Sequence, residues 1–507
     1  MAQQRQNIYI GAPGFRGLNT QDAPVGQDAS FASIAENAVI DSFGRIGARK
    51  GVKVVTSSAT PLGSSDGIEQ VFEYTKRDGT LIVFSTGNNK IFTGTTTLSA
   101  VTLPSGYSIT ANNWKIVSFN NDIYFFQSGH AALVSVAGST TLIAVVDGGT
   151  AAPAGNEVLA SFGRLWAADV VNNNYTVYWS DLLDADDWHG GSSGSLDLTT
   201  VWPTGYDEVT ALAEFNDFLV IFGKRSILLY SGASAPASMA LQDSITNIGC
   251  IARDSVQSTG SDLVFLSHTG VMSLGRLIQE KSNPIGSVSK NVRDEVVSNE
   301  LLETGNVKSV YSAENALYLL IMPANNLVYA FDMRGKLEDG SNRVTTWPFA
   351  GILCATRAES DGTLYLGVKT GIAEYEGYTD TAGVYTMKYY TQPLAFDDPS
   401  RVKMLKEINL TIIGGSGSSV VANWGYDYTQ SYNKQLFEVD TTFISEYGIS
   451  EYNVATSEYS SGIIVGIQKL KTTGSGKVVT IGIDATINGK AFSIQELNTE
   501  AIIGRLI

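Results

Sequence analysis

The histidines, aspartates and cysteines of this sequence are the residues that could catalyse a reaction or bind a metal. Their spacing does not match that of a known catalytic centre. The three histidines, His130, His189 and His268, each lie near Gly or Ser in a predicted turn. A nucleophile–base–acid set needs a histidine or a lysine in a defined setting. The sequence contains neither the HExxH motif of zinc proteases nor a Walker loop. We therefore expect exposed turn histidines, and we predict no catalytic and no cofactor-binding residue.

The densest group of possible metal ligands is the run SDLLDADDWHG, which holds Asp181, Asp184, Asp186 and Asp187. Calcium takes several carboxylate oxygens from one short loop, but this run lacks the central glycine and the closing glutamate of an EF-hand loop. We expect a solvated turn that follows a strand at 177–179 and ends with Trp188 packed on the fold. We predict no metal site, although the sequence leaves open whether an ion binds near residues 181–187.

Charge and cysteine content exclude several further classes of protein. The formal net charge is −16, without a basic block, which argues against a protein that grips nucleic acid by neutralising phosphates. Cys250 and Cys354 form no CxxC pair, so we expect two buried or half-buried thiols and neither a disulfide nor a zinc site. We expect no signal peptide and no membrane span, because no apolar run reaches the length that a spanning helix needs.

The elements that must position these residues are short strands in a repeated pattern. The stretch 209–232 predicts three strands joined by tight turns at Asn216-Asp217 and at 223–226. The order of apolar strand, Asn/Asp/Gly turn, apolar-aromatic strand, Gly turn and strand recurs at intervals of roughly 43 to 54 residues, the spacing of four-stranded propeller blades. The copies are 68–94, 114–136, 157–181, 209–232, 253–275, 307–332 and 352–377. We therefore predict an all-β protein with a six- or seven-bladed β-propeller.

The regions outside the repeats predict two further parts. Residues 1–60 lack a core of their own and are interpreted as an N-terminal arm with a hairpin at 38–50. Residues 61–384 are assigned to the propeller. Past 384 the strands alternate strictly between apolar and polar residues, which is typical of a β-sandwich, so 385–507 is assigned to a C-terminal sandwich that contacts an adaptor or neighbouring subunits. The Tyr-rich segment 445–462 is predicted to be an exposed loop, either a plain solvent loop or part of that contact.

One helix interrupts the strand pattern. The run 289–302 has Val292, Val296 and Leu302 at roughly helical spacing, and Ser287 or Ser289 is a candidate N-cap. We expect this helix to pack on the rim of a blade.

Three stretches resemble a known family. GLNTQDAPVGQDASFASIAENAVIDSFGRIGARKGV resembles the opening of the β-propeller tail proteins of tailed phages, and residues 17–22, 37–41, Gly44, Arg49 and Gly51 carry the match. VYWSDLLDADDW, followed by DEVTALAEFNDFLVIFGKRSILLYSG, resembles the tail hub or nozzle proteins of short-tailed phages. FSIQELNTEAIIGR, at 492–505, resembles the closing strand of their C-terminal β-domain.

The resemblance implies a structural virion protein without catalysis, assembled in the host cytoplasm and located in the tail. It implies a homohexameric ring beneath a portal and adaptor, with tail fibres or spikes as possible partners. Double-stranded DNA would leave through the ring without sequence-specific binding. An acidic chain poor in basic clusters fits such a conduit, because each phosphate contact with Lys or Arg would add affinity and slow sliding.

Two other functions are consistent with a propeller. The first is a receptor- or glycan-binding tail propeller, in which Trp114, Trp166, Trp188, Trp202 and Trp347 could stack on sugars. The second is a glycan depolymerase, which would need two carboxylates a few ångströms apart that the sequence does not single out among 50 acids.

Overall fold

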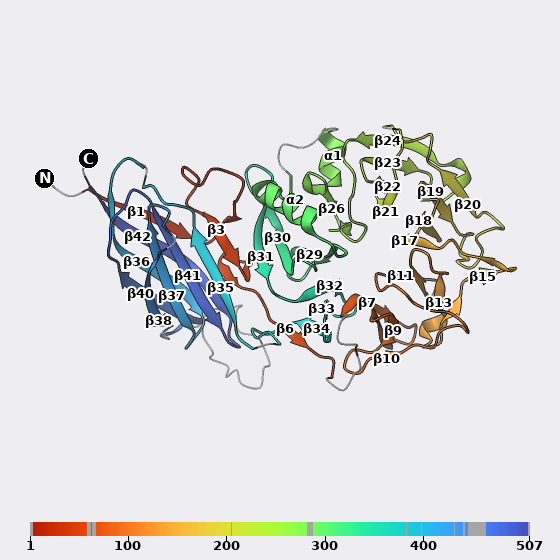
Figure 1. The fold of residues 1–507 in the computed structure, drawn as a ribbon, viewed down its shortest axis with the longest axis horizontal. Coiled ribbons are helices and arrows are strands. Elements are labelled where there is room, and N and C mark those ends of the chain that lie inside the picture. Colours follow the sequence, from red (N-terminus) through yellow and green to blue (C-terminus); the bar gives the residue numbers. More distant parts are fainter. Residues whose placement is uncertain are drawn as a thin grey trace.

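The chain is an all-β protein organised around a β-propeller. The computed structural model describes residues 4–57, 62, 67–203, 205–280, 287–381, 383–396, 398–429, 431–439, 442–444 and 463–504. Figure 1 shows two parts side by side, a ring of small sheets and a pair of large sheets beside which both chain ends lie. The predicted loop 445–462 lies outside the described residues.

Seven blades follow one another along the described chain: six are small antiparallel sheets, and the sixth blade is formed by four strands of a larger sheet. The first three blades are β7 (Ile68–Thr75), β8 (Leu81–Gly87), β9 (Lys90–Thr93) and β10 (Ser99–Ala100); β11 (Lys115–Phe119), β12 (Asp122–Phe126), β13 (Leu133–Ser135) and β14 (Ile143–Ala144); and β17 (Gly155–Ser161), β18 (Arg164–Val170), β19 (Thr176–Trp179) and β20 (Gly194–Asp197). A separate hairpin, β15 (Val146–Asp147) and β16 (Thr150–Ala151), joins the second blade to the third.

The remaining blades complete the ring. They are β21 (Val209–Phe215), β22 (Phe218–Gly223), β23 (Ser226–Ser231) and β24 (Ala240–Thr246); β25 (Gln257–Ser258), β26 (Leu263–Ser267) and β27 (Gly270–Ser273); β28 (Lys308–Ser312), β29 (Leu317–Met322), β30 (Leu327–Lys336) and β31 (Asn342–Pro348); and β32 (Ile352–Arg357), β33 (Leu364–Val368) and β34 (Gly371–Tyr375) with β6 (Val52–Val54). The first strands of neighbouring blades contact one another at every step of the ring except between the fourth and fifth blades, whose described first strands share no extensive contact, and β32 contacts β7. These first strands therefore surround the propeller axis.

Tight turns of the expected kind connect the blade strands. Asn216 and Asp217 have φ values of 48° and 63°, and Asn120 and Asn121 have values of 48° and 74°. Two consecutive residues with positive φ form the hairpin turn whose twist matches that of the flanking strands, and Asn and Asp tolerate this conformation. In the fourth blade, β22 is then buried on both faces because sheets of the neighbouring blades cover it.

The second part of the molecule is a pair of large sheets. One has the order β39 (Thr442–Ile444), β40 (Ile463–Lys471), β36 (Lys403–Gly414), β42 (Phe492–Ile503), β5 (Ile46–Ala48) and β4 (Ala38–Ile40), with β1 (Gln4–Gly11) also paired to β42. The other contains β2 (Gly17–Leu18), β3 (Phe31–Glu36), β35 (Tyr385–Thr391), β41 (Val479–Ile487), β37 (Ser419–Tyr426) and β38 (Asn433–Glu438), and it continues through β31 into the sixth blade.

The strands of residues 1–60 are divided among three sheets rather than forming a separate arm. β1, β4 and β5 belong to one large sheet, β2 and β3 to the other, and β6 is the fourth strand of the seventh blade. The physical reason is that these short strands have no core of their own and can bury their apolar residues only by pairing with strands far away in the sequence.

Two α-helices lie beside the fifth blade, α1 (Leu274–Glu280) and α2 (Arg293–Leu302), the latter preceded by the 3-10 turn η3 (Lys290–Val292). Two further 3-10 turns are η1 (Val136–Gly138) and η2 (Pro236–Ser238). The predicted helix therefore exists, and Ser289 stands at the N-cap position of η3, but its side chain makes no capping hydrogen bond. The Ser289 hydroxyl instead accepts a hydrogen bond from the Val271 amide at 2.9 Å, which ties the helix entrance to β27. No helix among the described residues has both the length and the apolar character that crossing a bilayer requires.

Candidate functional site

The three histidines do not converge. His130 is half-buried, and its ring centroid lies 5.3 Å from that of Trp114. Its Nε2 lies 3.0 Å from the Thr110 hydroxyl, so it holds a turn together rather than facing solvent as expected. His189 and His268 are exposed and belong to different blades. The described structure thus brings no two histidines to one site.

Three of the four predicted aspartates, Asp181, Asp184 and Asp187, form a turn by accepting hydrogen bonds from nearby groups. Asp181 accepts from the Ser192 amide at 2.8 Å and from the Ser192 hydroxyl at 2.5 Å, and these bonds lower the pKa of Asp181 to about 2. Asp184 accepts from the Asp186 amide, and Asp187 accepts from two amides. The carboxylates therefore serve the turn that the sequence predicted, with the Trp188 ring 6.1 Å from that of Phe126.

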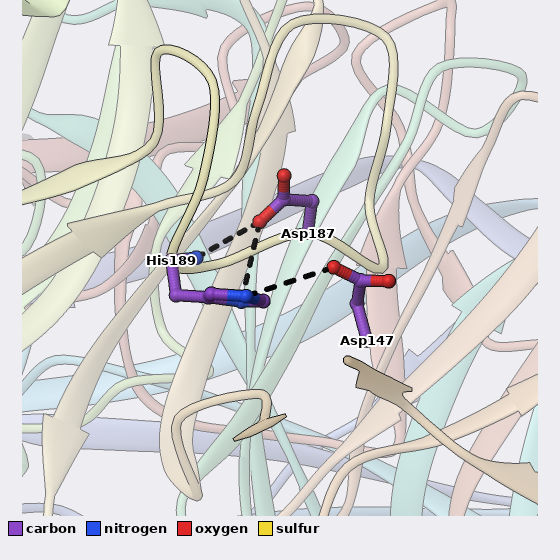
Figure 2. A group of neighbouring side chains, drawn as sticks. All are labelled: Asp147, Asp187 and His189. Carbon is purple, nitrogen blue, oxygen red and sulfur yellow. Dashed lines mark hydrogen bonds and ion pairs between the residues drawn. The ribbon is translucent and has the colours of Figure 1, made fainter. Parts of the chain in front are cut away.

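One trio of possible metal ligands was missed because it combines two segments. Figure 2 shows Asp147 from β15 beside Asp187 and His189. The His189 ring lies 3.8 Å from an Asp147 oxygen and 3.4 Å from Asp187 Oδ1. The Asp147 and His189 side chains are 50% and 44% exposed, and Asp187 Oδ1 already accepts two backbone hydrogen bonds. With two of three groups in solvent and the third already engaged, the trio stabilises a turn.

The strongest concentration of buried charge lies at the propeller axis. We call it the axial charge cluster: Lys115 on β11, Glu157 on β17, Arg253 and Asp254 before β25, and Lys308 on β28. The Asp254 carboxylate accepts from Arg253 Nη2 and from Lys308 Nζ, each at 2.7 Å. Four of the five side chains are at most 11% exposed, whereas Lys115 is 26% exposed.

Neutral amide side chains extend this cluster to further blades. Arg253 Nη1 donates to Asn156 Oδ1 on β17, and Arg253 Nη2 donates to Asn113 Oδ1, both at 2.8 Å. Lys308 Nζ donates to the same Asn113 oxygen and to Gln70 Oε1 on β7. One network of hydrogen bonds and ion pairs thus joins the inner ends of five blades.

The axial environment shifts the protonation of its members in opposite directions. Burial raises the pKa of Glu157 and lowers the pKa of Lys308, because low dielectric disfavours the charged form of each. Burial alone would also raise the pKa of Asp254, but Arg253, Lys308 and Lys115 together hold it well below its usual value. The Asp254 carboxylate is therefore ionised at neutral pH and lies at the centre of the cluster.

Two cavities adjoin the cluster, and Asp254 lines both. The first, of about 300 Å³, is bounded by Asn113, Asn156, Arg253 and the acidic residues Asp169, Glu300 and Glu303. The second, of about 250 Å³, is bounded by Lys115, Lys308, Gln257, Tyr311 and Arg357. Asp254 is thus the one cluster residue that both polar cavities share.

Sequence reasoning did not single out the axial residues, although the repeats carry a signal for them. A polar or charged residue stands near the start of the first strand in several copies: Gln70, Lys115, Glu157 and Lys308. These polar residues recur among the first three residues of their strands. Because first strands surround the axis, polar residues at equivalent positions must meet there.

A second buried polar site lies where the seventh blade meets the large sheets. The Arg49 side chain is 1% exposed and donates two hydrogen bonds to Asp380, at 2.6 and 2.8 Å. Its Nε donates to Asn37 Oδ1, and its guanidinium carbon lies 4.3 Å from the centroid of the Tyr385 ring. At Gly51 an added Cβ would lie 2.1 Å from the Thr379 carbonyl oxygen, so only glycine fits. We call Asn37, Arg49, Gly51, Asp380 and Tyr385 the junction site.

Cysteines and tryptophans are core residues. Cys250 and Cys354 are free and buried, as expected, and burial raises the pKa of each thiol to about 12. Four of the five candidate sugar-stacking tryptophans are at most 4% exposed: Trp114, Trp166, Trp202 and Trp347. Trp188 is half-buried against the second blade. The suggestion that these rings stack on sugars is therefore wrong for at least those four, because they fill blade cores.

The comparisons with known proteins find similar solved structures but no family model and no curated relative. The chain is similar to the WD40 domain of Neurospora crassa Pan2, with a TM-score of 0.38 and 9% identity over 65% of this chain and 94% of that chain. It is also similar to YCF48 bound to a D1 peptide, with a TM-score of 0.37 and 10% identity over 62% of this chain and 93% of that one.

A third similar structure is the WD40 β-propeller domain of Doa1, with a TM-score of 0.35 and 11% identity over 64% of this chain and 96% of that chain. Because the identities are only 9–11% and the TM-scores are 0.35–0.38, these similarities do not indicate what the protein binds or does.

Proposed function

We propose that the chain is a structural subunit of the tail of a short-tailed phage, a nozzle or hub without catalytic activity. Six copies would form a ring beneath a portal adaptor, and the genome would pass through that ring during ejection. The proposal rests on the residues that carry the family resemblance. Asn37, Arg49 and Gly51 belong to the buried junction site. Members of a family of structural proteins are expected to share residues that hold the fold together, and these three residues do so.

Rigid coupling of the two parts supports this role. The ten-stranded sheet runs from the sixth blade through β31, β2 and β3 into the C-terminal sheets. One hydrophobic cluster contains Leu266 and Phe331 of the propeller together with Ile408 and Ile483 of the C-terminal sheets. A subunit that must keep the bore of a ring constant under internal pressure needs such a stiff connection between its parts.

The axial charge cluster constrains where a conduit could lie. Arg253, Asp254 and Lys308 form ion pairs near the axis of each propeller, and Asp254 lines both cavities. A passage wide enough for duplex DNA would therefore have to run between copies of the chain. The net charge of −16 per copy gives such a passage a wall that repels phosphates or leaves them unbound.

The oligomeric state tests the proposal. We expect negative-stain images of the purified 54.2 kDa chain to show closed rings with sixfold symmetry, and mass photometry to show a species of six times that mass. Mixing the rings with short duplex DNA at physiological salt should give no stable complex. Single copies at every concentration up to the solubility limit, or tight retention of DNA, would contradict the proposal.

A further inference from the structure

Two charged groups of the axial region lack the hydrogen bonds that their burial calls for. Lys115 Nζ lies 3.5 Å from Glu157 Oε2 and 3.6 Å from Asp254 Oδ1, and it donates no hydrogen bond to any described residue. Glu157 Oε2 is buried and likewise has no hydrogen-bond partner among the described residues. An ammonium group carries three donors, and leaving them unused in a largely buried setting costs free energy unless another molecule accepts them.

The charges of the cluster do not balance. Three cations, Lys115, Arg253 and Lys308, face two carboxylates, Glu157 and Asp254. The pKa of Asp254 lies well below its usual value, whereas burial raises the pKa of Glu157 and so disfavours its charge. Within these five residues the cations therefore outnumber the carboxylates by one, while Asp169, outside the cluster, also acts on Arg253. Uncompensated charge away from water is expensive, and a small anion would compensate it.

The cavity beside Lys115 offers a second free donor. Arg357, on β32, lines the same cavity of about 250 Å³. Its Nε and Nη2 atoms are engaged with the Glu314 carboxylate, but its Nη1 donates to no described residue. Lys308, 4% exposed, adds positive charge to the wall, while Asp254 and the exposed Glu359 are the carboxylates that line the cavity. Free donors from the second and the seventh blade thus line one cavity that is open to solvent.

We propose that this cavity binds a small oxyanion, a phosphate or a carboxylate, that accepts hydrogen bonds from Lys115 Nζ and Arg357 Nη1. A cavity of this volume holds about eight waters at the density of liquid water, enough for a phosphate ion and part of its hydration shell. The ion would contact the second, sixth and seventh blades and so brace the ring where β32 meets β7. The binding does not depend on the proposed tail role.

Ligand-dependent thermal stability tests the site. We expect inorganic phosphate to raise the midpoint of thermal unfolding in a saturable manner, above the effect of sodium chloride at the same ionic strength, because an ion that binds only the folded state stabilises it by mass action. Acetate forms a parallel arm, and the arm with the larger shift identifies phosphate or carboxylate as the preferred chemistry. Isothermal titration calorimetry of the same protein should give a matching dissociation constant.

Three variants decide which residues are responsible. Lys115→Met should abolish the phosphate-dependent shift, and Arg357→Gln should weaken binding at least several-fold. Lys90→Met, which alters an exposed lysine outside the cavity, should keep the full shift. A shift retained in Lys115→Met, or equal shifts with phosphate, acetate and chloride in the unaltered protein, would overturn the proposal. If Lys115→Met does not fold, Arg357→Gln and the calorimetry of the unaltered chain still decide it.

Discussion

At the scale of single residues, the chain places its most buried charges where sheets from distant parts of the sequence meet. Arg49 pairs with Asp380 at the junction site, and Arg253 pairs with Asp254 at the axis. Removing one partner of a buried pair leaves the other charge uncompensated, which costs far more than breaking an exposed pair. These residues therefore fix how blades and large sheets are joined.

The junction site gives the first prediction. Replacing Arg49 by methionine should lower the free energy of unfolding by about 3–5 kcal/mol, because Asp380 loses its buried partner. Urea denaturation followed by tryptophan fluorescence measures this loss. The matched control is Arg5→Met, which removes the exposed Arg5–Glu500 pair and should cost at most about 1 kcal/mol. Equal losses in the two variants would contradict the importance of the junction site.

The axial charge cluster gives a prediction about pH. Asp254→Asn should destabilise the protein by about 3 kcal/mol or more at pH 7, because Arg253 and Lys308 lose their carboxylate. The pKa of Asp254 in the folded protein lies well below its ordinary value of 3.8. Its contribution is therefore fully present above pH 3.8 and is lost as the pH falls toward the folded-state pKa.

Denaturation curves of the unaltered chain and of Asp254→Asn, measured from pH 7 downward, check that expectation. The difference in unfolding free energy should stay constant to about pH 4 and shrink below it. A difference that grows as the solution is acidified would show that the assigned ionisation is wrong.

At the scale of elements, β6 closes the propeller. It is the fourth strand of the seventh blade, while the other three strands of that blade come from 352–375. β6 pairs with β34 although the two strands are far apart in the sequence, and this pairing joins the two ends of the ring. The ring can therefore open only if β6 separates from β34. Val52 is 3% exposed and packs into the cluster between the sixth and seventh blades.

Breaking this closure should loosen the seventh blade. Val52→Asp places a charge in an apolar core and should cost about 3 kcal/mol or more. Hydrogen exchange should accelerate in β34 and β32 before it does in β22, which lies across the ring. Lys53→Ser alters the neighbouring exposed side chain of the same strand and should leave exchange unchanged. Uniform acceleration across all blades in Val52→Asp would argue against β6 as the closing element.

At the scale of the whole molecule, propeller and C-terminal sheets form one cooperative unit. They share the ten-stranded sheet and a single hydrophobic cluster that includes residues of both parts. Neither part can unfold without exposing apolar surface of the other. We infer that the molecule has no hinge between the two parts.

Calorimetry tests this cooperativity. Differential scanning calorimetry should show one unfolding transition for the described core, with equal calorimetric and van't Hoff enthalpies for the monomeric species. The variant Ile483→Ala, which opens a cavity in the shared cluster, should lower the midpoint of the whole transition rather than split it. Two separate transitions in the unaltered chain would show that the propeller and the C-terminal sheets are independent.

The amino-acid sequence by itself determined the strands, their turns and the repeated blade, because alternation of apolar residues and positive-φ turns such as Asn216-Asp217 are local properties. It also determined that Cys250 and Cys354 would be buried. Only the tertiary structure decided that β1 to β6 would be divided among three sheets and that Lys115, Glu157, Arg253, Asp254 and Lys308 would meet at one axis. The reason is physical: an isolated strand encodes which face it buries, whereas its partner depends on which distant edge is left unpaired when the ring closes.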